Sequence, residues 1–351
     1  MKAAVLKATR DMSCEEVALP ELQPGEVLVR VAYCGVCGSD VPRFLNGAVH
    51  AFPLILGHEF SGVIQNVSEG VDDALVGTRV AGIPLVPCME CRDCQEGNFS
   101  LCKHYSFIGS RRSGAYAQYV AIPASNAFPI ADDVSDLQAA FFEPATVAQH
   151  AIELVDVRGR MRSDATAVVV GCGTIGIFTA QLLQDLGANV TALARRDSRI
   201  QAARSAGVMN VVNTSEPEWE SRLLASLERG GFDFVFDTSG NNAMMVQSLA
   251  LAANKACVCM VGTPKRPMEF SVREWEMLNR KELLLTGSWM SYSAPFPGKE
   301  WHEVSRQFAA GVLKVTDEMI DSIFSLEEIP DGMMKFAEGN SVSGKILVDC
   351  R

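Results

Sequence analysis

The sequence predicts a two-domain α/β protein, in which a β-rich, barrel-like domain precedes a doubly wound parallel sheet. Three observations support this fold class: the length of 351 residues, a change of hydrophobic pattern after about Ala145, and a glycine run at residues 171–176. A chain of this length can form two domains that each bury a core. Hydrophobic residues make up 48% of the chain and charged residues 21%, a balance typical of globular proteins.

Short strand-like runs, separated by Gly and Pro, fill the first half of the chain. Examples are residues 26–32 (EVLVRVA), 61–67 (SGVIQNV) and 77–82 (GTRVAG). Such runs between turn residues are typical of a β-rich, barrel-like domain. We place this domain at residues 1–148 and expect residues 290–351 to return to it.

The second half alternates between apolar strands and helix-period segments. Residues 165–170 (ATAVVV) are followed by a helical pattern at 174–187, and further strands are expected at 190–194, 232–236 and 256–261. Strands that alternate with helices predict a parallel, doubly wound sheet. We place this dinucleotide-binding domain at residues 149–289.

The glycine run lies between the first of these strands and its helix. It reads Gly171-Cys172-Gly173-Thr174-Ile175-Gly176. In this context such a turn lets the backbone approach a pyrophosphate, which the N-terminus of the following helix attracts. We therefore predict that Gly171, Gly173, Thr174, Ile175 and Gly176 bind a dinucleotide.

The end of the next strand favours NADP as that dinucleotide. An acidic residue about 20 positions after the glycines is typical of NAD-binding proteins. This chain instead has Ala194-Arg195-Arg196 there, and guanidinium groups suit the 2′-phosphate of NADP. Alternatively, Arg195 and Arg196 are solvated and Asp197 replaces the acid, which would allow NAD.

Charge and composition exclude several partners. The net charge of −11 argues against nucleic acid, because phosphate neutralisation needs a basic face. The sequence contains no apolar run long enough to span a bilayer and no secretory h-region at the N-terminus, so we expect a cytoplasmic protein without membrane contact. Eleven cysteines in such a compartment are not expected to form a disulfide framework.

Four of these cysteines predict a structural zinc site. Cys88, Cys91, Cys94 and Cys102 fall within fifteen residues, and the polar residues between them make a buried apolar cluster a poor alternative. Four thiolates are the ligand set of closed, tetrahedral, non-catalytic zinc sites.

A second, dispersed group suits a catalytic zinc. Cys37 follows a strand, and His58 and Glu59 follow an apolar run at residues 53–56. A Cys, a His and a carboxylate can hold zinc with one position open for substrate. Considered alone, His58 would be a structural histidine and Cys37 a small buried residue; their occurrence beside a four-cysteine lobe and a dinucleotide domain favours the metal.

At these motifs the chain resembles the zinc-containing medium-chain alcohol and sorbitol dehydrogenase family. The order is CGSD (37–40), GHE (57–59), the four cysteines, Glu143-Pro144 and GCGTIG (171–176). The resemblance implies a GroES-like catalytic domain and a Rossmann domain. It also implies that Cys37, His58 and Glu143 hold the catalytic zinc, with Glu59 as a neighbouring carboxylate that ligates directly or through water. Ser39 would accept the proton of the substrate hydroxyl, and Asp40 would orient His58.

Within that family the closer likeness is to galactitol-1-phosphate 5-dehydrogenases. It rests on segments from both domains: CGSDVPR (37–43), FIGSRR (107–112), RKEL (280–283), GSWMSY (287–292) and PFPGKEW (295–301). The likeness implies hydride transfer between a secondary hydroxyl of a polyol or polyol phosphate and NADP or NAD. It also implies a homo-oligomer, either a dimer or a tetramer.

A phosphorylated substrate would need basic side chains near the metal. Arg43, Arg111 and Arg112 lie next to the zinc motifs in sequence and are our candidates, although arginine pairs are commonly surface clusters. Two alternatives remain open: an unphosphorylated polyol or secondary alcohol as substrate, and a non-catalytic zinc- and nucleotide-binding protein.

Overall fold

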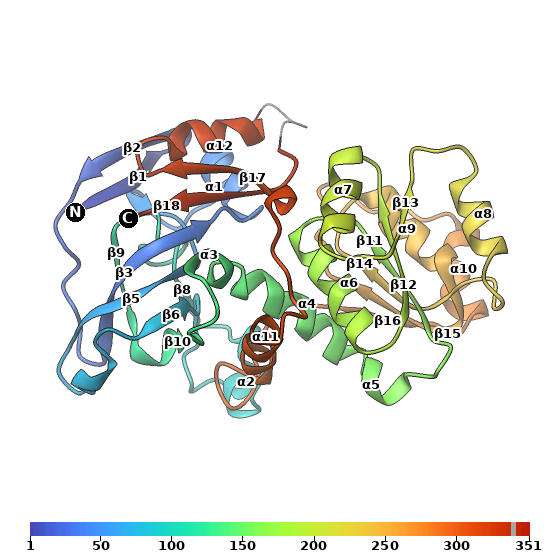
Figure 1. Ribbon diagram of the computed structural model, residues 1–351, viewed down its shortest axis with the longest axis horizontal. Helices are drawn as coiled ribbons and strands as arrows, with labels where there is room; N and C mark the ends of the chain where they lie inside the picture. Colours follow the sequence, from blue (N-terminus) through green and yellow to red (C-terminus); the bar gives the residue numbers. More distant parts are fainter. Residues whose placement is uncertain (338–341) are drawn as a thin grey trace. The chain divides into compact units, whose positions relative to one another are not determined.

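The computed structural model describes residues 1–337 and 342–351 and separates the chain into two units (Figure 1). Unit 1 comprises Met1–Pro144, Tyr292–Ala309 and Ile320–Arg351. Unit 2 comprises Ala145–Ser291 and Ala310–Met319. The first unit is rich in β-strands and the second contains a parallel sheet, so the predicted fold class is confirmed.

The main sheet of unit 1 has the strand order β10-β6-β5-β3-β18-β17, and β9 also pairs with β3. These strands are β3 (Glu26–Gly35), β5 (Glu59–Val67), β6 (Arg79–Gly82), β9 (Tyr119–Pro123), β10 (Ala127–Pro129), β17 (Ile320–Ser325) and β18 (Lys345–Asp349). Smaller sheets are formed by β1 (Lys2–Ala8), β2 (Asp11–Glu16) and β4 (Leu54–Ile55), and by β7 (Leu85–Val86) and β8 (Ser106–Phe107). The strands expected near residues 26, 61 and 77 are thus present.

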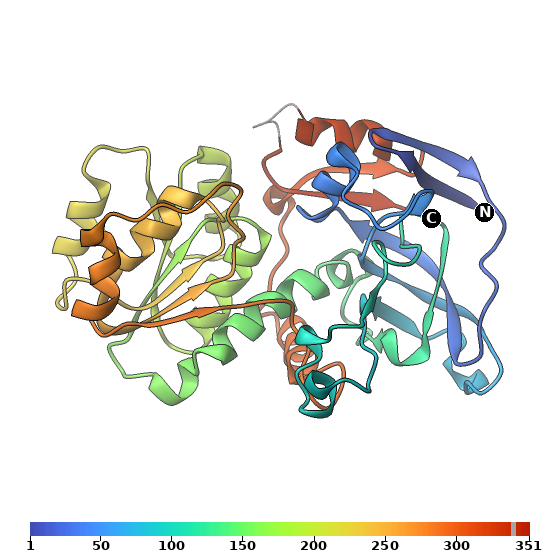
Figure 2. The ribbon, with the colours of Figure 1, turned by 180° about the vertical axis from the view of Figure 1, so that it is seen from behind.

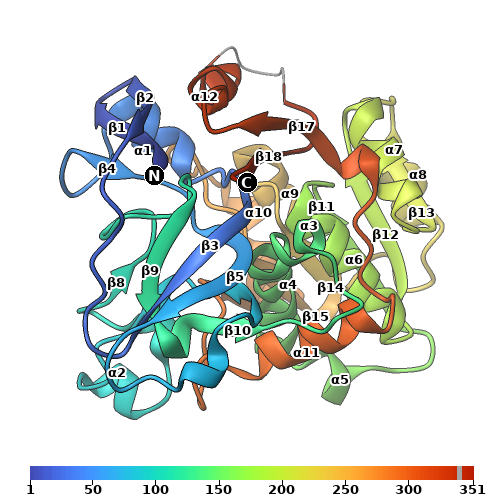
Figure 3. The same cartoon turned by 60° about the vertical axis from the view of Figure 1, so that its left-hand side comes forward.

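The last strand of the chain lies beside one of the first. β18 pairs antiparallel with β3, and Leu347 is opposite Gly35 (Figure 3). Val27, Val29 and Val31 of β3 are buried in the core of this unit. The C-terminal residues therefore complete the sheet that carries the metal-binding motifs.

Short helices connect the strands of unit 1. They are α1 (Asp40–Asn46), α2 (Arg92–Gln95), α3 (Asp136–Ala139), α11 (Lys299–Ala309) and α12 (Ile329–Ala337), with 3₁₀ turns η1 (Asp73–Leu75), η2 (Phe99–Leu101) and η3 (Ala124–Asn126). α4 (Phe142–Leu154) begins in unit 1 and continues into unit 2. Because Ser135 and Gln138 form a capping box, α3 has a fixed start just before α4.

Unit 2 is a parallel sheet in the order β13-β12-β11-β14-β15-β16. The strands are β11 (Thr166–Val170), β12 (Asn189–Ala194), β13 (Asn210–Asn213), β14 (Phe232–Asp237), β15 (Ala252–Met260) and β16 (Leu284–Gly287). This order runs outward from β11 in both directions, as in dinucleotide-binding folds. Ligands bind in such folds at the carboxyl ends of the strands, where the order reverses. Here that point is the glycine turn after β11.

Helices cover both faces of this sheet (Figure 1). They are α5 (Val157–Arg160), α6 (Thr174–Asp185), α7 (Asp197–Ser205), α8 (Trp219–Ala225), α9 (Asn242–Leu251) and α10 (Val272–Arg280), with the turn η4 (Asp317–Met319). α6 and α7 lie on one face, and α9 and α10 lie on the other. β16 forms one edge of the sheet, which Figure 2 shows from behind in orange.

The structure differs from the sequence prediction at two places in unit 2. β13 and β16 were not predicted as strands, because both are only four residues long. The segment Ala310–Met319, predicted to return to the first domain, belongs to unit 2. The Gln181 amide donates to Lys314 O at 3.3 Å, and the Ser205 and Thr316 hydroxyls are 2.9 Å apart, which fixes this segment there.

Among residues 1–337 and 342–351, no helix combines the length and the apolar character that crossing a membrane requires.

Candidate active site

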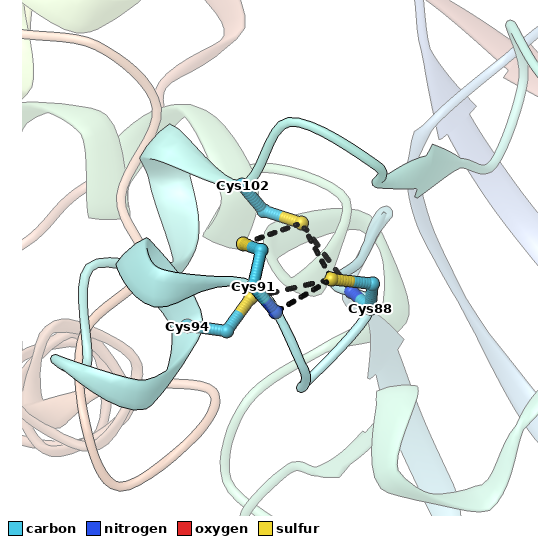
Figure 4. A group of neighbouring side chains, drawn as sticks. All are labelled: Cys88, Cys91, Cys94 and Cys102. Atoms are coloured by element: carbon cyan, nitrogen blue, oxygen red, sulfur yellow. Dashed lines mark hydrogen bonds between the residues drawn. The ribbon is translucent and has the colours of Figure 1, made fainter.

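The four cysteines of the predicted structural zinc site converge in unit 1. They come from the turn before α2, from α2 itself and from the residue after η2 (Figure 4). The Sγ–Sγ distances are 3.5 Å from Cys88 to Cys102, 3.9 Å from Cys88 to Cys94 and 3.9 Å from Cys91 to Cys102. A tetrahedron with Zn–S bonds of about 2.3 Å has S–S edges of roughly 3.8 Å. The donor set and its spacing therefore fit zinc.

Backbone N–H groups lower the pKa of two of these thiols, which favours the thiolate form that binds zinc. The backbone N–H of Cys94 lowers the pKa of the Cys91 thiol to about 6, and N–H groups of Glu90 and Cys91 lower that of Cys88. Burial raises the pKa of Cys94 to about 12. Zinc binds thiolates, so a bound metal would supply the charge that deprotonates the buried sulfur.

The second predicted cluster also forms in unit 1. The donor atoms of Cys37, His58 and Glu59 lie within 4.8 Å of one another. Cys37 follows β3, whereas His58 and Glu59 stand at the start of β5, the strand that pairs with β3. His58 and Glu59 are buried, and Cys37 is half-buried. The antiparallel pairing of two strands thus brings together motifs that are 21 residues apart.

Asp40 lies beside this cluster and has no exposed surface. Its Oδ1 accepts a hydrogen bond from Arg43 at 2.8 Å and lies 3.4 Å from Nδ1 of His58. Its Oδ2 accepts hydrogen bonds from the Cys37 backbone N–H at 3.1 Å and the Tyr116 hydroxyl at 3.0 Å. His58 Nδ1 is buried and has no hydrogen bond among the described residues. Because Nδ1 faces Asp40, Nε2 is the nitrogen available to a metal.

Glu59 has a partner that sequence reasoning missed. Lys345 Nζ in β18 donates to Glu59 Oε2 at 2.5 Å and to Val36 O at 3.3 Å. Burial alone lowers the pKa of Lys345, but the charge of Glu59 raises it above its ordinary value. The two residues are 286 positions apart, so no local pattern could have linked them.

Glu143 lies in the first turn of α4, half-buried. Burial, and then the charge of Glu59, raise the pKa of its carboxyl to about 7. The charges of His58 and Lys345 act on it in the opposite direction, which places it in the same electrostatic environment. A carboxyl in this position can ionise at neutral pH when a cation is added.

The donor atoms of this cluster are of the kinds that zinc binds. They are a sulfur, an imidazole nitrogen and a carboxylate oxygen, from Cys37, His58 and Glu59. Three protein ligands of these kinds leave one position of a tetrahedral zinc open. The residues present therefore fit a catalytic zinc.

Ser39 and Arg43 lie at the start and in the middle of α1. Ser39 is its exposed N-cap, and its hydroxyl accepts a hydrogen bond from Arg43 at 3.2 Å. The ion pair between Arg43 and buried Asp40 fixes the guanidinium next to the metal cluster. Arg43 thus lies beside the metal cluster, and Asp40 neutralises part of its charge.

Arg111 and Arg112 do not share a site. The Arg111 guanidinium stacks over the Tyr105 ring at 4.0 Å, and Tyr105 contacts Phe107, whose ring meets the His58 ring edge to face. Arg112 instead pairs with Glu26 at 2.5 Å and donates to Ala121 O. Glu26 thus neutralises the charge of Arg112, and a role of Arg111 or Arg112 in binding substrate phosphate stays a prediction.

The predicted dinucleotide site of unit 2 is a cavity of about 790 Å³ at the carboxyl ends of the strands. Gly171, Gly173, Arg195 and Arg196 line it, and Thr174, Ile175 and Gly176 form the first turn of α6 behind the glycines. A Cβ on Gly176 would lie 1.9 Å from Gly171 O, so only glycine allows α6 to pack this close to β11.

Several further residues of this cavity were not predicted. Arg199, Ser215 and Trp219 also line it. Arg199 follows Arg196 by three positions across the start of α7, so helical spacing could have indicated it. Asp197, the alternative acid for an NAD ribose, is exposed and lies outside the lining residues.

Two dehydrogenase family models match this chain. The chain matches the models of the alcohol dehydrogenase GroES-like domain over residues 23–132 and of zinc-binding dehydrogenases over residues 174–310. It is 35% identical to galactitol 1-phosphate 5-dehydrogenase of Escherichia coli (strain K12) over 353 residues, which cover 99% of each chain. It is 28% identical to sorbitol dehydrogenase of Bacillus subtilis (strain 168), covering 99% of this chain and 97% of that one.

The structure is also similar to that of a solved dehydrogenase. The crystal structure of galactitol-1-phosphate dehydrogenase from Escherichia coli matches with a TM-score of 0.91 and 34% identity, covering 99% of this chain and 100% of that one. The chain therefore belongs to the zinc-containing medium-chain alcohol and sorbitol dehydrogenase family.

Proposed function

We propose that this protein is a zinc-dependent, NADP-preferring dehydrogenase that oxidises a secondary hydroxyl of a polyol phosphate, similar to galactitol 1-phosphate, to a ketose phosphate. The observation that carries the reaction type is the convergence of Cys37, His58 and Glu59 in unit 1. The full-length similarity to a galactitol 1-phosphate 5-dehydrogenase supports the substrate class.

We assign two zinc sites per chain. Cys88, Cys91, Cys94 and Cys102 would hold a structural ion, and Cys37, His58 and Glu143 would hold a catalytic one, with Glu59 adjacent. When bound, the catalytic zinc supplies a Lewis acid that polarises the substrate hydroxyl, and the nicotinamide supplies the hydride acceptor.

The chain's own residues divide the remaining work. Exposed Ser39 is placed to accept the proton of the substrate hydroxyl, and the Arg43 side chain next to it keeps its oxygen oriented. Asp40 faces His58 and limits the rotation of its ring, while Lys345 fixes one oxygen of Glu59. Residue 42 is proline, which cannot relay a proton, so the proton leaves Ser39 by another route.

NADP preference follows from the cavity of unit 2. Arg195, Arg196 and Arg199 line it, and none of the cavity's lining residues is acidic. A 2′-phosphate placed there would meet guanidinium groups, with which phosphate forms strong, bidentate hydrogen bonds. An NAD ribose would lack its usual carboxylate partner.

Initial rates on matched substrates test this function. Galactitol 1-phosphate, galactitol and sorbitol would each be offered with NADP and with NAD. We expect the highest kcat/KM for galactitol 1-phosphate with NADP. Equal rates on galactitol would favour an unphosphorylated polyol, and no turnover of any alcohol by a chain that holds zinc would favour the non-catalytic alternative.

A variant pair tests the phosphate contact. Arg111→Ala should raise KM for galactitol 1-phosphate without affecting galactitol, because Arg111 is next to Tyr105 and Phe107 beside His58. Arg306→Ala, which removes an exposed arginine from α11, is the matched control. An unchanged KM in Arg111→Ala would leave Arg43 as the phosphate-binding candidate.

We also propose that the chain forms a homo-oligomer through the β16 edge of unit 2. β16 pairs with β15 on one side, and its residues Leu284 and Leu285 are exposed by 43% and 37%. Unpaired edges that carry apolar side chains favour pairing with another chain. Light scattering should give a dimer or tetramer for the wild type and a smaller mass for Leu285→Lys.

A further inference from the structure

Tyr116 is a buried residue near the metal cluster that the sequence did not single out. Its side chain has no exposed surface, and its hydroxyl donates a hydrogen bond to Asp40 Oδ2 at 3.0 Å. Buried hydroxyl groups are retained where they have a hydrogen-bond partner, since leaving one unpaired is costly. Tyr116 and Asp40 are 76 positions apart, so this contact depends on the fold.

The backbone around Tyr116 is fixed against the segment that carries His58. Tyr116 N–H donates to Leu56 O at 2.9 Å, and Ala115 N–H donates to Gly57 O at 3.0 Å. On the other side, Tyr116 O accepts a hydrogen bond from Ala4 N–H in β1 at 2.8 Å. The position of the Tyr116 ring is therefore set by the strand-like segment that ends at His58.

The ring itself occupies the space above Gly57. A Cβ on Gly57 would lie 2.6 Å from Cδ1 and 2.8 Å from Cε1 of Tyr116, and Gly57 has a φ of +95°. Position 57 thus needs glycine both for its backbone conformation and for the approach of this ring. Tyr116 touches the residue before His58 with its ring and reaches Asp40 with its hydroxyl.

These contacts determine how the Asp40 carboxylate is oriented. Its Oδ2 receives the Tyr116 hydroxyl and the Cys37 N–H, which leaves Oδ1 directed at Arg43 and His58. A rotation of this carboxylate would move the oxygen that faces His58 Nδ1. The hydroxyl of Tyr116 opposes that rotation from a fully buried position.

We infer that Tyr116 is a positioning residue for the metal cluster, which acts through Asp40 to hold His58 and the Cys37 turn in the geometry that binds zinc. This inference rests on the assignment of the catalytic zinc in the proposed function. Partners that orient metal ligands from outside the coordination sphere typically contribute about 10- to 100-fold to metal affinity. Tyr116 is one contact further out, so we expect an effect near the lower end, about 10-fold.

Metal retention in Tyr116→Phe tests the inference. This substitution removes one oxygen and keeps the ring that packs on Gly57. Zinc per chain would be measured after dialysis against a graded series of chelator concentrations. The zinc that Cys37→Ser fails to bind is the catalytic one, and its loss is the quantity to be followed. The zinc of the four-cysteine lobe serves as the internal control. We expect Tyr116→Phe to lose the identified zinc at roughly tenfold lower chelator concentration, with the other zinc unchanged.

Two controls separate positioning from a general loss of structure. Tyr119→Phe removes the same atom three residues further on, in β9, where the side chain lines a different cavity with Val120 and Ala121. It should retain zinc as the wild type does. Thermal unfolding and NADPH binding by unit 2 would verify that both variants are folded.

A double-mutant cycle with Asp40→Asn tests the route of action. If Tyr116 acts through Asp40, the loss of zinc affinity in the double variant is smaller than the product of the two single effects. Multiplicative effects would overturn the inference, as would wild-type zinc retention in Tyr116→Phe. A wild type that holds both zinc ions but oxidises no alcohol would refute the proposed function alone, because zinc retention still decides the role of Tyr116. A wild type with one zinc would refute both.

Discussion

Lys345 Nζ and Glu59 Oε2 form an ion pair at 2.5 Å in which the side chains are only 8% and 2% exposed. The pair joins the last strand of the chain to β5, which begins directly after His58. Removing one partner of a buried pair leaves an uncompensated charge, which is more costly than the loss of the attraction itself.

Lys345→Met should therefore lower the free energy of unfolding by about 3–5 kcal/mol, measured by urea denaturation. Adding Glu59→Gln should recover part of that loss, because the unpaired carboxylate is gone. Lys2→Met, which breaks an exposed pair with Glu327, is the control and should change the free energy of unfolding far less. Equal effects of the two lysine substitutions would contradict the prediction.

Asp237 at the end of β14 predicts a pH dependence of stability. It has no exposed surface, and burial raises its pKa to about 6 despite hydrogen bonds from Ser239 and Gly240. The folded state then binds more protons than the unfolded state between about pH 4 and 6. The contribution of Asp237 to stability is accordingly present below that range and is lost as the pH rises through it.

Asp237→Asn should remove that loss. The amide oxygen can still accept the backbone hydrogen bonds, but the side chain carries no charge at any pH. The free energy of unfolding would be measured in urea at pH 4 and at pH 7. Relative to the wild type, the variant should be more stable at pH 7 than at pH 4 by up to about 3 kcal/mol. A constant difference between the two proteins across this range would show that Asp237 does not titrate there.

Lys281 explains part of the RKEL segment in structural terms. Its Nζ donates to the carbonyl oxygens of Leu249, Ala250 and Ala252 at 3.1, 2.9 and 2.7 Å, around the C-terminus of α9. We expect Lys281→Met to destabilise the protein by about 1–3 kcal/mol, because buried acceptors lose a charged donor. Thermal unfolding measures this effect. Lys255 has an exposed ammonium that pairs with Glu282, so the control variant Lys255→Met should change the unfolding temperature little.

Cofactor choice should depend on the arginines after β12. The double variant Arg195→Ala/Arg196→Ala is expected to raise KM for NADP by about 10- to 100-fold, since charge-assisted hydrogen bonds to phosphate are lost. KM for NAD should change little. Arg204→Ala, in the last turn of α7 and outside the cavity, is the control. If the wild-type protein prefers NAD, the assignment of Arg195 and Arg196 to the 2′-phosphate of NADP is wrong.

Zinc content should separate the two metal sites. We expect two zinc ions per chain by elemental analysis. Cys37→Ser should retain one zinc and remain folded without dehydrogenase activity. Cys102→Ser should lose the other and unfold at lower temperature, because structural zinc stabilises the fold that provides its ligands. Loss of both ions in either variant would mean that the sites are not independent.

The sequence predicted those features whose signals are local. The glycine turn and the strand before it specify the cofactor end of unit 2, and the four cysteines stand within fifteen residues of each other. The motifs of Cys37 and His58, which lie next to the ends of the paired strands β3 and β5, were also found, because their residue types are informative together. Short strands such as β13 were not predicted, because four residues are too few to show a clear hydrophobic alternation.

Contacts between distant residues could not be predicted in this way. Lys345 and Tyr116 meet the metal cluster only after β18 and the segment before β9 have paired with their neighbours. Arg111 and Arg112 are adjacent in sequence but have different partners, because the nearest acceptor for Arg112 is Glu26, which is 86 positions away.

The two proposed metal sites would also differ in when they form during synthesis. The cysteine lobe closes over fifteen consecutive residues, so it could take up an ion as soon as residue 102 has emerged from the ribosome. The other cluster draws on residues 37, 58, 143 and 345. The ion pair between Glu59 and Lys345 forms only when the final strand is in place, so the nascent chain would complete the proposed structural site early and the proposed catalytic site last.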